Sequence, residues 1–332
     1  MLNALTIDVE DYFQVHAFSR VIKFEDWDNF ECRIEDSTYR ILEILNELPQ
    51  TSSLTSQNSV KATFFILGWI AERYPRLIKE ISLQGHEIAS HGYNHKLIYH
   101  QTKEEFKDDI RKSKVILEDM IGMEVIGYRA PSYSITNKSK WAFEVLIEEG
   151  FKYDSSIFPI RHDFYGMPNA PRFPFIVSLN GNSSFEFSML NHESRTGLNS
   201  KSIIEFPTST IRIFGQNLPI SGGGYFRLFP FHFTKGGLMK INREEKKPFV
   251  FYIHPWELDS EQPKIRGTGF KSKFRHYNNL DKTEMRFKKL LKNFQFATIR
   301  EVIGQYGTIR LTDNSYRMGA WKDNSTNCEV YD

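Results

Sequence analysis

Residues 61–95 read KATFFILGWIAERYPRLIKEISLQGHEIASHGYNH. The segment opens with an apolar, β-rich run over Lys61–Leu67 and continues with apolar residues at helical spacing over Ala71–Gln84. It closes with a second short β-rich run over His86–Ser90, which leads directly into a pair of histidines. A strand, a helix and a strand of these lengths form a βαβ unit, in which the two strands lie parallel in one sheet.

The same alternation extends outward in both directions. Further strands are predicted at Asn3–Val9, Val125–Tyr128, Phe151–Tyr153, Lys247–Ile253 and Gln295–Ile299. Further helices are predicted at Ser37–Leu48, from the Thr102–Glu105 capping box to Gly122, at Asn137–Glu149 and at Thr283–Phe294. The pattern predicts an α/β fold with a parallel sheet and crossover helices, either open or closed into a barrel.

The middle of the chain differs from this pattern. Residues 157–240 are rich in Pro, Gly, Phe and Asn and show few helical patterns, so we expect loops and irregular strands inserted on one face. We therefore predict one domain over residues 1–300 that includes this insertion, followed by a weakly ordered C-terminal tail over 301–332.

Composition sets broad limits on the class of protein. The 332 residues are 25% charged and 40% hydrophobic, as in ordinary globular proteins. Two cysteines exclude a disulfide scaffold and a cysteine-rich zinc site, and fit a reducing compartment. A net charge of +2 gives no electrostatic case for nucleic-acid binding. The aromatic content of 14% suits either a large core or a ligand with flat faces, such as a carbohydrate.

The chain shows no membrane or export signal at the sequence level. The longest apolar runs, such as residues 62–70, are far shorter than the roughly 20 residues of a membrane helix. The N-terminal MLNALTIDVEDYF has no basic region and has acids where a signal peptide is apolar. These features predict a cytoplasmic protein, with the inner membrane face as a candidate site of action.

Titratable side chains follow five of the predicted strands, where active sites of parallel α/β proteins collect. The groups are Asp8-Val9-Glu10-Asp11, His91-Gly92-Tyr93-Asn94-His95, Arg129-Ala130-Pro131-Ser132-Tyr133, Asp154-Ser155-Ser156 and His254-Pro255-Trp256-Glu257.

Two histidines at His-x3-His spacing, joined by one carboxylate, form the ligand set of a catalytic zinc or a similar metal. A polar helix face or a loop is the alternative interpretation of His91 and His95 alone. Asp8 and Glu10 lie on the same face of an extended strand, whereas Asp11 points the other way unless the strand has ended. One of these carboxylates would bind the metal, and another would take a proton from the attacking water.

Three further residues suit supporting roles. Arg129, in a loop restricted by Pro131, would keep a neighbouring carboxylate ionised, since an adjacent cation lowers the pKa of a carboxyl group. His254 suits a general acid, and Asp154 could orient it through a ring nitrogen. A surface arginine and a core histidine are the alternatives for these residues in isolation.

The order of these groups resembles the motifs of the polysaccharide deacetylases of the NodB-homology group, carbohydrate esterase family 4. The resemblance implies a distorted (β/α) barrel of about seven strands with one divalent metal, Zn²⁺ in the first place and Co²⁺, Ni²⁺ or Fe²⁺ as alternatives. It makes Asp8 the catalytic base and His91 and His95 metal ligands, with Glu10 as the matching carboxylate ligand and Asp11 as the fallback.

The resemblance also assigns the remaining groups. Arg129 would orient Asp8, and His254 would be the acid with Asp154 behind it. Pro131, Ser132 and Tyr133 would contact substrate, with a backbone N–H near Ser132 facing the oxyanion. The family expects an aromatic residue directly after the proline, and here it comes one residue later.

Four longer segments resemble the deacetylase subfamily found with exosortase-linked exopolysaccharide loci, which has its own C-terminal extension. They are DVEDYFQVHAF (8–18), SGGGYFRLFP (221–230), YIHPWELD (252–259) and FRHYNNL (274–280). The resemblance covers roughly residues 1–300.

These patterns lead to a functional hypothesis with two alternatives. We expect metal-dependent removal of N-acetyl groups from an N-acetylhexosamine-containing glycan, including a lipid-linked one, in exopolysaccharide biosynthesis or modification. A C–N hydrolase of a small cyclic amide or ureide, or an inactive glycan-binding protein, are the alternatives. Glycan contacts are predicted at Gly222–Gly224, Phe226, Phe229 and Phe231, with core packing as the alternative for each Phe.

The basic stretch Lys264–Lys292 suits an anionic glycan, a lipid pyrophosphate or an anionic membrane face. A solvated helix face is its alternative interpretation. Peripheral membrane contact is therefore part of the hypothesis about partners.

Overall fold

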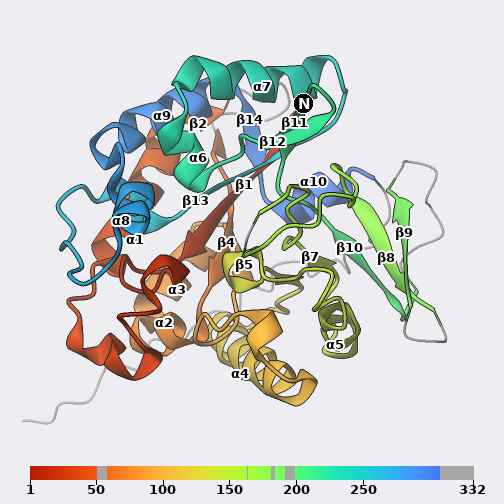
Figure 1. The fold of residues 1–332 in the computed structure, drawn as a ribbon, viewed down its shortest axis with the longest axis horizontal. Helices are drawn as coiled ribbons and strands as arrows, with labels where there is room; N and C mark the ends of the chain where they lie inside the picture. The colour runs from red at the N-terminus through yellow and green to blue at the C-terminus, as the bar shows by residue number, and fades with distance from the viewer. Residues whose placement is uncertain (51–57, 163, 181–183, 191–198, 307–332) are drawn as a thin grey trace, which may run out of the picture.

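The computed structural model describes residues 1–50, 58–162, 164–180, 184–190 and 199–306 (Figure 1). Most of the predicted tail, residues 307–332, lies outside the described residues. One sheet forms the centre in the order β13-β1-β4-β5-β6-β7-β10-β8-β9, and β14 also pairs with β1. Its strands are β1 (Leu2–Val9), β4 (Thr63–Ile66), β5 (Glu87–Ser90), β6 (Gly127–Tyr128), β7 (Tyr153–Asp154), β8 (Phe175–Leu179), β9 (Phe185–Met189), β10 (Ser202–Glu205), β13 (Val250–Ile253) and β14 (Gln295–Ala297).

The strands from β13 to β10 pair in parallel, and only β8 and β9 add antiparallel partners at one end. Along β1, β13 pairs with Ala4–Ile7 and β14 pairs with Leu2–Ala4. Over the described residues, backbone pairing does not close the sheet into a ring. The prediction of a parallel α/β fold is confirmed. The sheet is barrel-like, but hydrogen bonds between its described strands do not close it.

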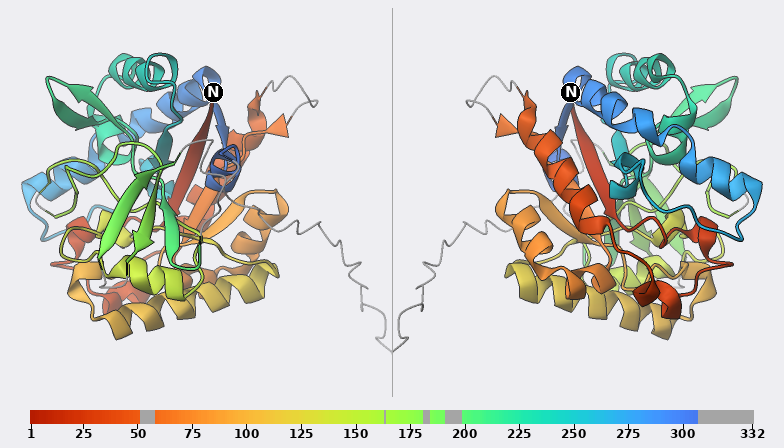
Figure 2. Two further views of the ribbon diagram at one scale, coloured as in Figure 1. Left: turned by 90° about the vertical axis from the view of Figure 1, so that its right-hand side faces the viewer. Right: turned by 90° about the vertical axis from the view of Figure 1, so that its left-hand side faces the viewer.

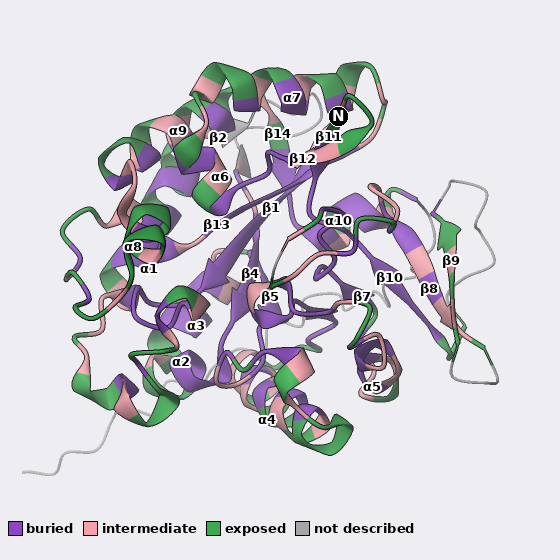
Figure 3. Ribbon diagram, viewed as in Figure 1, coloured by how far each residue is buried: buried purple, intermediate pink, exposed green. Residues whose placement is uncertain are grey.

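Helices flank the sheet, and most of them bury one apolar face. They are α1 (Ile34–Glu47), α2 (Gly68–Arg73), α3 (Pro75–Leu83), α4 (Lys103–Ile121), α5 (Ala142–Glu148), α6 (Gly223–Leu228), α7 (Phe231–Arg243), α8 (Phe270–Tyr277), α9 (Thr283–Asn293) and α10 (Ile299–Gly304). Strands β4, β5 and β13 are buried along their whole length, whereas the helices alternate buried and exposed residues (Figure 3). The side views place α4 at the end of the molecule opposite the N-terminus (Figure 2).

Two small hairpins lie outside the main sheet. They are β2 (Pro49–Gln50) with β3 (Asn58–Ser59), and β11 (Thr210–Ile213) with β12 (Gln216–Pro219). Short 3₁₀ turns η1–η6 occupy His16–Phe18, Phe24–Asn29, Ile98–His100, Pro131–Tyr133, Pro255–Leu258 and Leu280–Lys282.

Capping chemistry explains where two of the predicted helices begin and end. At the start of α4, Thr102 Oγ1 accepts from the Glu105 N–H at 3.1 Å, and Gly122 ends the helix in the left-handed conformation. The single helix predicted over Ala71–Gln84 is wrong, because Tyr74 has non-helical angles (φ −123°, ψ 54°) and Pro75 starts a new helix. A residue before proline disfavours the helical region, whereas proline itself suits the first turn.

The prediction for residues 157–240 is wrong in two respects. Strand β10 joins the main sheet beside β7, and β8 and β9 extend the sheet from there. Helix α7 buries Thr234, Gly237, Leu238 and Ile241, which lie three, four and seven residues apart on one helical face. Its adjacent glycines weaken the helical propensity, so packing rather than local preference forms this helix.

Candidate active site

The carboxyl ends of the parallel strands bring the predicted groups together. Asp8 and Glu10 come from the end of β1, and His91 and His95 follow β5. Arg129 follows β6, and His254 follows β13. The acids and histidines of the first two strands are almost fully buried, and the His254 side chain is 16% exposed, so it marks the side open to solvent.

Glu10, His91 and His95 form a candidate metal centre. One ligand atom from each lies within 4.8 Å of the others, and His95 Nε2 lies 2.8 Å from Glu10 Oε2. His91 Nδ1 donates to the Arg129 carbonyl at 2.8 Å, which leaves Nε2 with a lone pair. Burial lowers the pKa of His91 to about 4, so its ring is the neutral form that binds metals. Two imidazoles and one carboxylate fit a zinc-like ion.

The carboxylate that joins the two histidines is Glu10, and Asp11 lies outside the group. The Asp11 carboxylate instead accepts from the backbone N–H groups of Tyr12 at 2.8 Å, Arg33 at 2.7 Å and Ile34 at 3.0 Å. It thereby holds the first residues of α1. The fallback assignment of Asp11 gains no support, because its oxygens are already engaged away from the histidines.

Asp8 is held by the predicted arginine. Arg129 Nη1 donates to Asp8 Oδ1 at 2.5 Å and to Thr6 Oγ1 at 2.8 Å. The other side of the guanidinium donates to the carbonyl and hydroxyl of Ser155 at 3.0 and 2.9 Å. Arg129 has no exposed surface, and its planar group is therefore fixed from both sides. The predicted Arg129–Asp8 contact is present.

His254 faces both carboxylates of β1. Its Nε2 lies 3.2 Å from Glu10 Oε1 and 4.0 Å from Asp8 Oδ2, and its Nδ1 lies 2.6 Å from Glu257 Oε1. Burial disfavours the charged ring, but the Glu10 and Glu257 carboxylates outweigh it and raise the pKa of His254 to about 9. The two carboxylates thus favour the protonated ring, which is the form that a general acid requires.

The predicted contact between Asp154 and His254 is wrong. Asp154 Oδ1 accepts from Ser156 Oγ at 2.5 Å, and that hydroxyl in turn accepts from the Ala130 N–H at 2.7 Å. Burial raises the pKa of Asp154 to about 6, and burial together with the neighbouring Asp154 carboxylate raises the pKa of Glu205 well above its ordinary value. The pair therefore braces the loop after β6, and Glu257 occupies the position behind His254.

Backbone strain marks the loop predicted to contact substrate. Ser132 and Tyr133 have φ angles of 50° and 55°, in the left-handed region that costs non-glycine residues roughly 1–3 kcal/mol. Tyr133 packs edge-on against Phe158 and Tyr252, with ring centroids 5.4 and 5.2 Å apart. This packing holds the loop beside Arg129 and leaves Ser132 half-buried.

The predicted glycan contacts in the glycine-rich segment are corrected in part. Phe226 is fully buried and packs edge-on against Phe251 at 4.9 Å, so it belongs to the core. A Cβ on Gly222 would lie 1.9 Å from the Tyr252 carbonyl, so the close approach there is to β13. Phe229 and Phe231 are half-buried, and their glycan contacts stay predictions.

Three residues of the site escaped prediction. Glu257 lies three positions after His254, with Pro255 between them, which is the spacing of a capping box. This spacing could have indicated the contact between Glu257 and His254. Arg227, which donates to Glu257 at 2.6 Å, and Glu205 come from distant segments and follow no local pattern.

Solved structures establish the class of fold. A structure from Mycobacterium smegmatis, named as a polysaccharide deacetylase, is 20% identical with a TM-score of 0.54, over 91% of this chain and 88% of that one. The structure of an allantoinase, Puue, is 14% identical with a TM-score of 0.52, over 92% and 90% of the two chains. The α/β fold is therefore that of the NodB-type deacetylases and their structural neighbours.

Sequence comparisons identify the family of one segment of the chain. Residues 24–146 match the family model "Polysaccharide deacetylase", and residues 155–304 match "Domain of unknown function (DUF3473)". A peptidoglycan-N-acetylglucosamine deacetylase of Bacillus cereus is 36% identical over 97 residues, and a peptidoglycan deacetylase of Helicobacter pylori is 32% identical over 117. The matches cover 29% and 35% of this chain, and 35% and 38% of those relatives. Residues 24–146 of the chain therefore form a polysaccharide deacetylase domain, and the chain spans about a third of the length of these relatives.

Proposed function

We propose that this protein hydrolyses the N-acetyl groups of an N-acetylhexosamine-containing glycan and releases acetate, in exopolysaccharide biosynthesis or modification. One observation carries the proposal: an arginine-held carboxylate, Asp8, and an imidazole, His254, lie beside the Glu10–His91–His95 group. A base and an acid beside a metal centre are the parts that amide hydrolysis needs.

The metal would be held by Glu10, His91 and His95. When bound, it would polarise the amide carbonyl and increase the acidity of a water molecule. Two imidazoles and a carboxylate favour Zn²⁺, and Co²⁺, Ni²⁺ and Fe²⁺ accept the same donors.

The side chains supply the proton transfers. Asp8 accepts the proton of the attacking water, and Arg129 holds the receiving carboxylate in place. His254 Nε2 donates a proton to the sugar amine as the C–N bond breaks, so the amine leaves neutral. A backbone N–H near Ser132, in its strained conformation, would stabilise the oxyanion of the tetrahedral intermediate.

Acetate release from N-acetylglucosamine oligomers, measured with the metal content of the purified protein, tests the proposal. We expect about one metal per chain, loss of acetate release on chelation and recovery on adding Zn²⁺. A metal-loaded protein that releases no acetate but opens a cyclic amide or ureide would support the rival C–N hydrolase, which the fold shared with an allantoinase favours. A protein that neither binds metal nor turns over would support the inactive glycan-binding alternative.

The exposed face of α8 supports contact of this site with an anionic membrane. Phe270 is 86% exposed and Phe274 is 48% exposed, with ring centroids 6.5 Å apart on one helical face. The surrounding cations, all exposed, are Lys264, Arg266, Lys271, Lys273 and Arg275. Exposed aromatic rings among cations are typical of interfacial helices, and the cytoplasmic leaflet is anionic.

A lipid-linked glycan would reach the site from such a surface, because α8 lies close to the acid. Its inner residue His276 stacks on Trp256 at 4.1 Å, and Trp256 stacks on His254 at 5.2 Å. None of the helices in the described part of the chain has the length and apolar content of a membrane span. The proposed contact is therefore peripheral.

Co-sedimentation with vesicles of phosphatidylglycerol and phosphatidylcholine tests this contact. We expect binding that rises with the phosphatidylglycerol fraction, falls with salt and is lost in the double variant Phe270→Ser/Phe274→Ser. Phe214→Ser is the matched control, since Phe214 is fully exposed in the β11–β12 turn. Equal sedimentation of the wild type with neutral and anionic vesicles would rule the contact out.

A further inference from the structure

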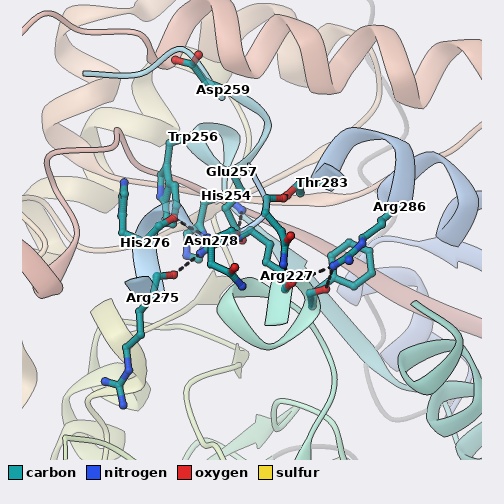
Figure 4. Close-up of polar contacts among 12 residues, drawn as sticks. Arg227, His254, Trp256, Glu257, Asp259, Arg275, His276, Asn278, Thr283 and Arg286 are labelled. Atoms are coloured by element: carbon teal, nitrogen blue, oxygen red, sulfur yellow. Dashed lines mark hydrogen bonds and ion pairs between the residues drawn. The ribbon is translucent and has the colours of Figure 1, made fainter. Parts of the chain in front are cut away.

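The acid His254 is held from behind by a carboxylate that the family resemblance does not assign. Glu257 Oε1 lies 2.6 Å from His254 Nδ1 and also accepts from the His254 backbone N–H at 3.1 Å (Figure 4). The same oxygen thus fixes both the ring and the backbone of one residue. A carboxylate at Nδ1 keeps that nitrogen protonated and points Nε2 at the opposite side, where Glu10 and Asp8 lie.

Glu257 is in turn held by a buried arginine. Arg227 Nε donates to Glu257 Oε2 at 2.6 Å, and both residues are almost completely buried. The remaining guanidinium nitrogens donate to the carbonyls that end α8, those of Arg275 at 3.0 Å, His276 at 2.6 Å and Asn278 at 3.1 Å (Figure 4). A planar group with four fixed acceptors cannot rotate, so the position of Glu257 is set by the fold of α6 and α8.

Ring stacking restricts the remaining motion of the imidazole. Trp256 lies on His254 with an interplanar angle of 22°, and His276 lies on Trp256 with an angle of 12°. The same α8 residue whose carbonyl accepts from Arg227 therefore also supports the stack. Arg227, Glu257 and the stacked Trp256 ring therefore all restrict the side chain of His254.

All of these residues lie within 155–304, the segment that matches a domain of unknown function. His91, His95 and Arg129 lie within 24–146, the segment that matches the deacetylase family. We infer that the 155–304 segment supplies the acid half of the site, with Glu257 and Arg227 as positioning residues for His254. The expected change in kcat rests on the proposed hydrolysis, whereas the expected change in the position of the His254 ring does not.

A double-variant cycle on the zinc-loaded protein tests the inference. Glu257→Gln keeps the size of the side chain and an acceptor oxygen but removes the charge that holds Arg227. We expect kcat for acetate release to fall by about 10- to 100-fold with KM and metal content unchanged, the usual range for residues that orient a reacting group. In a His254→Ala background the same substitution should change kcat by less than about two-fold, because its effect passes through His254.

A matched control separates this role from a general loss of packing. Glu245→Gln breaks another arginine–carboxylate pair of the same segment, in which Arg172 donates to Glu245 at 2.7 and 3.1 Å. It should leave kcat unchanged. Equal falls in kcat for Glu257→Gln with and without His254 would overturn the inference. If Glu257→Gln does not fold, Glu257→Asp, which keeps the charge on a shorter side chain, should show a smaller fall with the same dependence on His254.

An NMR measurement without substrate tests the positioning role of Glu257 independently of the proposed hydrolysis. At a pH above the range in which His254 titrates, the ¹⁵N shifts of its neutral ring should show the proton on Nδ1 in the wild type and a mixture of tautomers in Glu257→Gln. A wild type that releases no acetate but shows this change would contradict the proposed hydrolysis and support the positioning role. Identical tautomers in both proteins would overturn the positioning role.

Discussion

Arg129 Nη1 lies 2.5 Å from Asp8 Oδ1, although 121 positions separate the two residues in the chain. The contact forms because β1 and β6 lie parallel in one sheet and deliver their last residues to the same edge. Arg129 also donates to Thr6 on β1 and to Ser155 after β7. One buried guanidinium thus connects three strand ends around the proposed base.

The role of Asp8 leads to the first prediction. Asp8→Asn should lower acetate release by about 10² to 10⁴-fold, the usual contribution of a general base, with metal content unchanged. Asp108→Asn, on the exposed side of α4, is the matched control and should keep the wild-type rate. An Asp8→Asn protein with near wild-type turnover would remove Asp8 from the mechanism.

The neighbouring carboxylates of Glu10 and Asp11 have different roles, one beside the two histidines and one at the start of α1. Glu10→Gln should lose most of its bound metal in elemental analysis, since it removes the charged ligand between His91 and His95. Asp11→Asn should keep its metal but unfold more easily, by about 1–2 kcal/mol, because Asp11 accepts from three backbone N–H groups, two of them at the start of α1. Metal loss in Asp11→Asn alone would reverse the assignment.

The buried pair of Asp154 and Glu205 predicts a pH dependence of stability. The folded state raises both pKa values, that of Asp154 to about 6, so it retains protons that the unfolded chain releases above roughly pH 4. The stability that these protons contribute is therefore complete below about pH 4 and is lost as the pH rises through 6 and beyond.

Glu205→Gln should remove much of this loss of stability at rising pH, because the Gln amide can donate a hydrogen bond to Asp154 but has no proton that titrates. Relative to wild type, the free energy of unfolding of Glu205→Gln should rise by at least about 1 kcal/mol between pH 4.5 and pH 8, measured in urea. Glu186→Gln, exposed on β9, is the control. A parallel pH dependence of Glu205→Gln and wild type would contradict the raised pKa of Glu205.

Two glycines predict opposite effects of the same substitution. Gly222→Ala should destabilise the fold by about 2 kcal/mol or more, because its φ is 140° and its Cβ would overlap the Tyr252 carbonyl. Gly236→Ala, in α7 with open space around its Cβ, should stabilise by roughly 0.5–1 kcal/mol. Thermal unfolding of both variants checks this pair, and equal melting temperatures would contradict it.

The sequence predicted the parts of the site that follow from strand periodicity. A residue at the end of a parallel strand reaches the same edge as its counterparts, so the strands alone predicted that His91, His95 and Arg129 meet the acids after β1. The choice of Glu10 among those acids came from the family resemblance. The alternation of Asp8 and Glu10 also determined that both face His254.

The partners of these residues depended on the tertiary structure. The sequence placed Asp154 behind His254, but β10 lies beside β7 and brings Glu205 to Asp154 instead. Nothing local in residues 157–240 indicated that this segment adds strands to the main sheet or that Arg227 reaches Glu257.

The sequence by itself determined the parallel α/β architecture, the resemblance to the polysaccharide deacetylases and the two histidines of the candidate metal centre, because these depend on short-range periodicity, on motifs and on residues at strand ends. Only the tertiary structure decided that Glu10 rather than Asp11 joins the histidines and that Glu257 rather than Asp154 supports His254. Packing between segments that are distant in sequence decides which side chains become partners. Local sequence patterns do not indicate which strands become neighbours in the sheet.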